Sequence, residues 1–122
     1  MKIWVTGSQD WDDSMLLARA LTLVIQEIDM NDKSITFIHT DRMGAEQTLG
    51  SYVAKTKSFL VGKGFKVSEF IPAKALEFDE KLQKVLDQSP EILLVFNKGK
   101  DFKVAKMKDL AKSNGIKVVE YK

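Results

Sequence analysis

Three short polar segments hold the side chains that could do chemistry. They are residues 7–13 (GSQDWDD), 39–46 (HTDRMGAE) and 97–101 (NKGKD), and each follows a run of mainly apolar or β-branched residues. Hydroxyls, carboxylates, an imidazole and a guanidinium in such places can bind polar ligands, hold cations or transfer protons. If the preceding runs are parallel strands, the three segments meet at the carboxyl edge of one sheet, where α/β proteins bind ligands.

His39 is the only histidine, so a histidine pair and a histidine-rich metal site are both excluded. A neighbouring carboxylate, Asp41 or Asp10, could make His39 a general base, whereas the alternative is a hydrogen bond to a loop. No nucleophile-elbow sequence surrounds Ser8 or Thr40, so we expect these hydroxyls to bind rather than react. The three segments therefore predict a binding site without a catalytic residue.

The first segment carries three carboxylates, those of Asp10, Asp12 and Asp13. At the start of a following helix they would cap its free N–H groups and satisfy its dipole. The alternative is a divalent cation shared with Asp41, because magnesium and calcium take oxygen ligands. We expect capping, with no resident metal ion and no cofactor.

Arg42 and Trp11 are the side chains best suited to bind a ligand that has an anionic group and a ring. Arg42 could make two parallel hydrogen bonds to a phosphate or carboxylate, and the alternative is an intramolecular salt bridge. Trp11 could stack on a base, or it could cover the core. The sequence leaves both pairs of alternatives open.

Basic residues concentrate towards the C-terminal end. The net charge is only +2, but residues 98–122 hold eight lysines and three acidic residues. Phe102 is the only aromatic side chain among the lysines of 98–112, and binders of single-stranded nucleic acid combine basic grooves with stacking aromatic side chains. We therefore expect a solvated helix face with nonspecific attraction for phosphate, and no nucleic-acid partner.

The apolar pattern alternates between the periods of strands and of amphipathic helices, with turn residues between them. Five segments are strand-like, the fourth being the most continuously apolar: 2–6, 34–39, 66–71, 91–96 and 116–121. Four segments have the pattern of helices: from Asp12 or Asp13 to about Ile28, from Gly44 to about Leu60, 78–88, and 102–113. Asn31-Asp32 is the stop signal after the first of these, and Gly62 and Gly64 are the stop signals after the second. Strict alternation predicts a single Rossmann-like α/β domain of three layers, with a five-stranded parallel sheet and helices on both faces. Strands 2–6 and 91–96 are expected side by side at its centre.

Length and composition limit the class of protein. The 122 residues suffice for one domain with one core, and the absence of cysteine excludes disulfides and thiol chemistry. No window approaches the roughly 20 apolar residues of a membrane span. We expect a cytoplasmic protein, in the host cytoplasm if a phage encodes it, without membrane association.

The polar segments also resemble the signatures of a known family. Residues 5–13 (VTGSQDWDD) are similar to V-T-G-S-R-x-W-x-D, the opening strand and turn of the YspA-related branch of the SLOG superfamily of Rossmann-like proteins. Residues 39–46 resemble its second signature, H-G-G-A-R-G-A-D, and 114–119 (NGIKVV) resemble its ending. The resemblance implies the sheet order 3-2-1-4-5 and a pocket for a nucleotide or a nucleotide-derived ligand.

Several positions depart from the family pattern. Thr40-Asp41 stands where the family has two glycines that let backbone amides approach phosphate, and Gln9 stands where it has arginine. The arginine–asparagine pair of the third helix has no counterpart, and the phosphate loop and catalytic set of the related nucleosidases are missing. We therefore expect no phosphoribohydrolase activity.

These observations predict a non-enzymatic binder or sensor of a nucleotide-like small molecule. The alternative is a phage- or bacteria-encoded protein-interaction module that has lost the pocket and acts on a partner protein. A homodimer through exposed helix faces is also expected, with Tyr52, Phe59 and Leu60 as candidate contacts if they lie on the surface. The predicted ligand-binding residues are Gly7, Ser8, Gln9, Trp11, His39, Thr40, Asp41, Arg42, Gly44, Asn97, Lys98 and Gly99.

Overall fold

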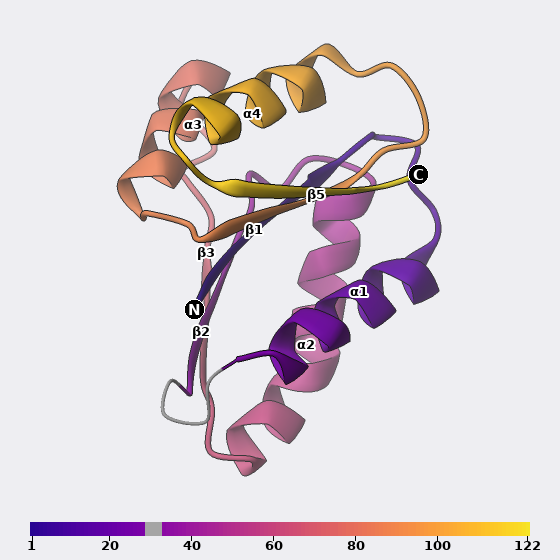
Figure 1. Cartoon of the computed structure of the whole chain (residues 1–122), viewed down its shortest axis with the longest axis vertical. Helices are drawn as coiled ribbons and strands as arrows, with labels where there is room; N and C mark the ends of the chain where they lie inside the picture. Colours follow the sequence, from indigo (N-terminus) through magenta and orange to yellow (C-terminus); the bar gives the residue numbers. More distant parts are fainter. Residues whose placement is uncertain (29–32) are drawn as a thin grey trace.

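The structure, a computed structural model, describes residues 1–28 and 33–122. Strands and helices alternate along the chain (Figure 1) in the order β1 (Lys2–Gly7), α1 (Ser14–Gln26), β2 (Ser34–Ile38), α2 (Ala45–Gly62), β3 (Lys66–Phe70), α3 (Phe78–Asp87), β4 (Ile92–Phe96), α4 (Phe102–Ser113) and β5 (Lys117–Tyr121). The sheet has the order β3-β2-β1-β4-β5, and all neighbouring strands are parallel. The predicted α/β fold, its sheet order and the central pair β1–β4 are confirmed.

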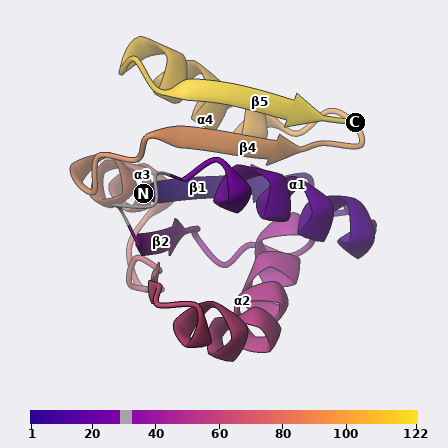
Figure 2. The ribbon, with the colours of Figure 1, turned by 60° about the horizontal axis from the view of Figure 1, so that its bottom comes forward.

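The helices cover both faces of the sheet, as predicted. Helices α1 and α2 pack against one face and α3 and α4 against the other (Figure 1). Because side chains alternate along a strand, Ile3 and Val5 belong to the core under α1 and α2, and Trp4 belongs to the core under α3 and α4. Figure 2 shows β5, β4, β1 and β2 side by side and pointing the same way, with α1 across one face.

The predicted boundaries agree with the structure to within two residues. Helix α1 begins after Asp13, whose Oδ1 accepts a hydrogen bond from the backbone N–H of Leu16 at 2.9 Å. It ends at Gln26, and the predicted end at Asn31-Asp32 lies outside the described residues. Gly62 is the last helical residue of α2, and Gly64, with φ +93°, makes the left-handed turn after it.

At the centre of the sheet, the connections that follow two neighbouring strands leave towards opposite faces. The connection after β1 leads to α1 on one face, and the connection after β4 leads to α4 on the other face. Such a switch point leaves a crevice outside the carboxyl ends of the two strands. None of the described helices combines the length and the apolar character needed to cross a membrane.

Candidate functional site

The first loop begins where the backbone of β1 passes closest to its neighbours. A Cβ on Gly7 would lie 2.2 Å from the carbonyl oxygen of Phe96 and 2.6 Å from the Cβ of Ala45, so that only glycine fits. The next residue, Ser8, donates its backbone N–H to Phe96 and accepts at Oγ from the backbone N–H of Lys98, both at 2.9 Å. Gly7 and Ser8 therefore fix the loop after β1 against the loop after β4.

The second loop closes around Glu46, which is fully buried. Glu46 Oε1 accepts from the backbone N–H and the hydroxyl of Thr40, at 2.5 and 2.7 Å, and Oε2 accepts from the hydroxyl of Thr6 at 3.0 Å. A buried carboxylate is destabilising unless its oxygens are hydrogen-bonded, and these three donors satisfy that need. Thr40 thus anchors the start of α2.

His39 lies buried beneath the same loop. Its Nδ1 accepts from the backbone N–H of Asp41 at 3.0 Å, which places the proton of the neutral ring on Nε2, and Nε2 donates to Glu69 Oε2 at 2.8 Å. Of the two roles left open for His39, the loop hydrogen bond is the one the structure contains. Asp41 itself has a left-handed backbone with φ +60°, a conformation that glycine adopts without strain.

Arg42 reaches from the second loop to the third. Its Nη2 donates to Asp101 Oδ2 at 2.8 Å and its Nη1 donates to the carbonyl oxygen of Gly7 at 3.2 Å. Only 9% of the Arg42 side chain and 15% of the Asp101 side chain are exposed. Of the two roles left open for Arg42, the structure contains the intramolecular salt bridge.

Asp101 has a second task as the N-cap of α4. Its Oδ1 accepts from the backbone N–H groups of Lys103 and Val104, at 3.0 and 3.2 Å. Burial alone would raise the pKa of Asp101, but the hydrogen bonds from Arg42 and from the backbone outweigh it, so that the pKa lies below its ordinary value. The carboxylate is therefore ionised at neutral pH and pairs with Arg42.

The third loop carries a second, exposed ion pair. Lys98 Nζ donates to Asp12 Oδ1 at 2.6 Å, which lowers the pKa of Asp12 and raises that of Lys98. Asn97 donates from Nδ2 to Glu120 Oε2 at 3.4 Å. The three loops meet at one edge of the sheet, as predicted, but most of their polar groups contact one another.

Gly44 and Trp11 have structural roles in this arrangement. Gly44 has φ +85°, and a Cβ there would lie 2.4 Å from the carbonyl oxygen of Ser8. Trp11 is buried, its ring centroid lies 5.4 Å from that of Phe96, and its Nε1 donates to the carbonyl oxygen of Asp13. Trp11 therefore covers the core, the second of its two predicted roles.

Two of the hollows that the described residues form border the first loop at this edge. The first, of about 270 Å³, lies between the loops after β1 and β4, and we call it the switch cavity; it is lined by Ser8, Gln9, Asp10, Gly99, Lys100 and Asp101. The second, of about 400 Å³, lies between the first loop and α2 and is lined by Gln9, Asp10, Trp11, Asp12, Gly44, Gln47, Thr48 and Ser51. The remaining predicted residues line neither of these two cavities: Gly7, His39, Thr40, Asp41, Arg42, Asn97 and Lys98.

Asp10, Lys100 and Asp101 line the switch cavity although the predicted set does not contain them. They belong to two of the segments predicted to meet at this edge, but the sequence does not show which side chains of those segments line the cavity. Glu46 was also missed, and here the sequence held a signal. Glu46, Leu49 and Val53 are spaced three and four residues apart, so that the carboxylate falls on the apolar side of the helix.

Two further predictions concern metal ions and self-association. Within residues 1–28 and 33–122 no three His, Asp or Glu side chains gather to hold a metal ion. Of the residues predicted at a dimer contact, Phe59 is 66% exposed, Tyr52 is partly buried and Leu60 is buried. Leu60 does not meet the condition of surface exposure, since it packs in the core under α1 and α2.

Comparison of the chain with protein-family models finds no match, and comparison with curated proteins finds no significant match. The similarity to SLOG proteins therefore depends on the motifs quoted above. Gly7, Trp11 and Gly44, which match those motifs, all have structural roles in this fold, which explains their presence without a ligand.

Proposed function

We propose that the protein binds one nucleoside or mononucleotide in the switch cavity and does not transform it. The observation that carries this proposal is a cavity of about 270 Å³ between the loops that follow β1 and β4. Small molecules bind α/β sheets preferentially at this switch point. The cavity lies just below the range of about 300–1,000 Å³ that is usual for ligand pockets, so it has room for at most one nucleoside unit and is too small for a dinucleotide.

The lining offers hydrogen bonds of both kinds. The Ser8 hydroxyl accepts from Lys98 and keeps its own hydrogen for a ligand, and the Gln9 amide can donate and accept. The Asp10 carboxylate forms no salt bridge with any described residue. A carboxylate can accept two hydrogen bonds, from adjacent ribose hydroxyls or from an exocyclic amine.

Few hydrogen-bond donors and cations remain at the cavity for a di- or triphosphate group. The helix N-termini beside the cavity are already capped by Asp13 and Asp101, and these backbone donors are what phosphate sites commonly use. Lys100 is the lysine that lines the cavity. This favours a nucleoside or a monophosphate over a triphosphate.

Binding without turnover follows from the state of the candidate bases. Both ring nitrogens of His39 are hydrogen-bonded beneath the second loop, and the Ser8 hydroxyl makes no hydrogen bond to a carboxylate or an imidazole among the described residues. An activated nucleophile needs such a base within about 2.6–3.2 Å. The arrangement therefore supports recognition, as in a sensor or a sequestering protein.

The test is a thermal-shift screen with the common nucleosides and their 5′-monophosphates, followed by calorimetric titration of the best ligand. Asp10→Ala should weaken binding by roughly 10- to 150-fold, the scale of a hydrogen bond to a charged group. Glu80→Ala, which removes an exposed carboxylate of α3, serves as the control and should bind as the wild type does. Binding that is equally strong in both variants would refute the assignment to the switch cavity.

The alternative, a module that acts on a partner protein, is favoured by one observation. The second loop, which would hold phosphate in the SLOG pattern, is closed by Glu46 and Arg42. A screen in which no nucleoside or nucleotide raises the melting temperature would favour this alternative.

A further inference from the structure

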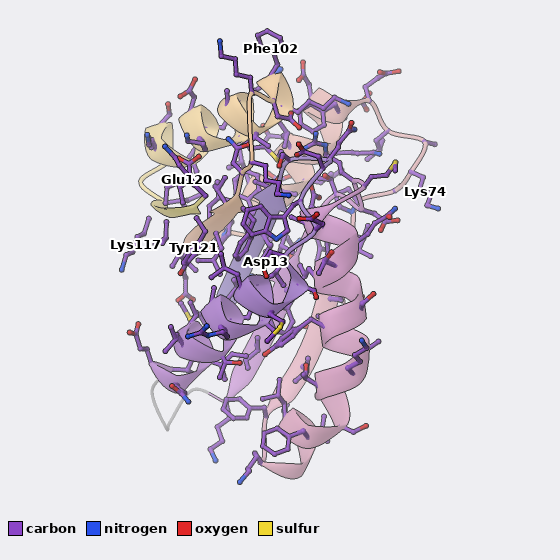
Figure 3. All side chains as sticks on the ribbon, turned by 90° about the vertical axis from the view of Figure 1, so that its right-hand side faces the viewer. Asp13, Lys74, Phe102, Lys117, Glu120 and Tyr121 are labelled. Atoms are coloured by element: carbon purple, nitrogen blue, oxygen red, sulfur yellow. The ribbon has the colours of Figure 1, made fainter. Side chains whose placement is uncertain are left out.

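The loop after β4 and the first turn of α4 form a second surface beside the switch cavity, with which it shares Gly99, Lys100 and Asp101. Phe102, the first residue of α4, is 95% exposed. Figure 3 shows its ring projecting beyond the ribbon at the top of the molecule. The ring lines a mainly apolar hollow of about 300 Å³ together with Ala105, Lys100 and Lys108.

A second hollow, of about 460 Å³, adjoins the first. Asn97, Gly99 and Lys108 line both, and Lys98 and Lys122 add two more ammonium groups to the second. This hollow is polar, so an aromatic, apolar space lies directly beside a lysine-rich one.

The carboxylates at these hollows are already paired. Asp101 binds Arg42 at 2.8 Å, and Glu120 accepts from Lys108 at 2.8 Å. Lys100 and Lys122 form no salt bridge with a described residue. Two unpaired ammonium groups therefore lie beside a mainly apolar hollow, and this combination suits an anionic ligand that also has a flat, apolar part.

We propose that this surface, the Phe102 platform (Phe102, Lys100, Lys108 and Lys122), binds single-stranded nucleic acid. One base lies against the ring of Phe102 in the smaller hollow, and the neighbouring phosphates lie against Lys100 and Lys122, which form no salt bridge with a described residue. Base stacking on an aromatic ring accepts any base, because each base has a π face. An acidic protein surface would satisfy the lysines but would leave the flat hollow beside Phe102 without a matching group.

A strand fits this surface better than a free nucleotide does. The lysines line two adjoining hollows, so that there is room for more than one phosphate around the single stacked base. The lysine run alone predicted only a solvated face, and the proposal departs from that expectation because of the exposed ring and the hollows beside it. It does not depend on the switch cavity, which holds a different ligand.

The test is fluorescence anisotropy of a fluorescein-labelled oligothymidylate about 12 nucleotides long, a length within the range covered by single-strand binding folds. Phe102→Ala should weaken binding by roughly 5- to 150-fold, and Phe102→Trp should preserve it. Lys122→Gln should reduce the slope of log affinity against log salt by about 0.7. The matched controls are Phe59→Ala, which removes an exposed phenylalanine of α2, and Lys74→Gln, which removes an exposed lysine. Figure 3 shows Lys74 at the right of the molecule, away from Phe102 at the top.

Thermal unfolding verifies that each variant folds. Replacement of an exposed ring such as that of Phe102 should leave the melting temperature unchanged.

Absence of oligothymidylate binding at low salt, or an equal loss of binding in Phe59→Ala and Phe102→Ala, would overturn the proposal. Competition by thymidine monophosphate at the same concentration as the strand would overturn the preference for a strand. Equal competition by polyglutamate would overturn the role of base stacking and favour an acidic protein partner. Nucleoside binding that survives in Phe102→Ala would leave the switch cavity assignment intact.

Discussion

Replacing Arg42 with alanine removes one half of a nearly buried ion pair. The guanidinium donates to Asp101 and to the carbonyl oxygen of Gly7, and both charged side chains are less than one-sixth exposed. Removing one partner of a buried pair leaves an uncompensated charge and costs about 3–5 kcal/mol. A domain of 122 residues has a total stability of about 6–18 kcal/mol, so that Arg42→Ala should lose a large part of it.

Substitutions at Asp101 separate the ion pair from the helix cap. Asp101→Asn keeps an oxygen for the backbone N–H groups of α4 but removes the charge opposite Arg42, whereas Asp101→Ala removes both functions. Asparagine is as good an N-cap as aspartate, and losing a cap costs typically about 1 kcal/mol. Asp101→Ala should therefore be about 1 kcal/mol less stable than Asp101→Asn.

The measurement is urea unfolding followed by tryptophan fluorescence, for which the buried Trp4 and Trp11 are suitable reporters. With a slope of about 2 kcal/mol/M, a loss of about 3–5 kcal/mol lowers the midpoint by about 1.5–2.5 M urea. Arg19→Ala, at the only other arginine and on the exposed side of α1, is the control and should change stability by less than about 0.5 kcal/mol. If Arg42→Ala proves no more costly than Arg19→Ala, the ion pair is not structural and the reasoning fails.

Two further predictions use the same unfolding assay. The pKa of Asp101 is lowered in the folded protein, so that its contribution to stability is complete above the unfolded value of about 3.9 and is lost as pH falls through the lower, folded value. Asp101→Asn should thus lose less stability than the wild type below about pH 4, and an identical loss in both would contradict this. Gly44→Ala should cost more than about 1 kcal/mol because of its positive φ, with further loss from the contact with Ser8. Gly62→Ala, where no atom lies within 4 Å of the new Cβ, should be neutral or stabilising by up to about 1 kcal/mol; equal effects at the two glycines would refute the steric argument.

The fold was predictable because each of its determinants is local. The continuous apolar run of β4 marks a strand buried on both faces, and the N-caps Asp13 and Asp101 stand directly before the helices they begin. Alternation of strands with crossover helices then restricts the topology to a parallel sheet. What periodicity leaves undecided is the last residue of each element, since helix and strand ends depend on tertiary contacts.

The sequence predicted where the loops of the candidate site lie but not which side chains contact one another there. Position along the chain identifies the three loops, but the pairs His39–Glu69 and Arg42–Asp101 join residues 30 and 59 positions apart. Such pairs depend on strand register and side-chain direction, which no local pattern contains. An arginine in a ligand-edge loop therefore has the same sequence signature whether it faces a phosphate or a buried carboxylate.

The pairing of β1 with β4 also affects how the chain can fold during synthesis. The carboxyl end of β1 pairs with Phe96, so that about 89 residues separate the partners, and a ribosome needs roughly 4–18 s to add them at about 5–20 residues per second. During that interval β1 has β2 as its one possible neighbour, and its other edge, with the apolar Ile3, Trp4 and Val5, lacks hydrogen-bond partners. An unpaired apolar strand edge invites association with other chains. Nascent chains that stall before β4 emerges should therefore depend on chaperones and should be early targets of proteolysis.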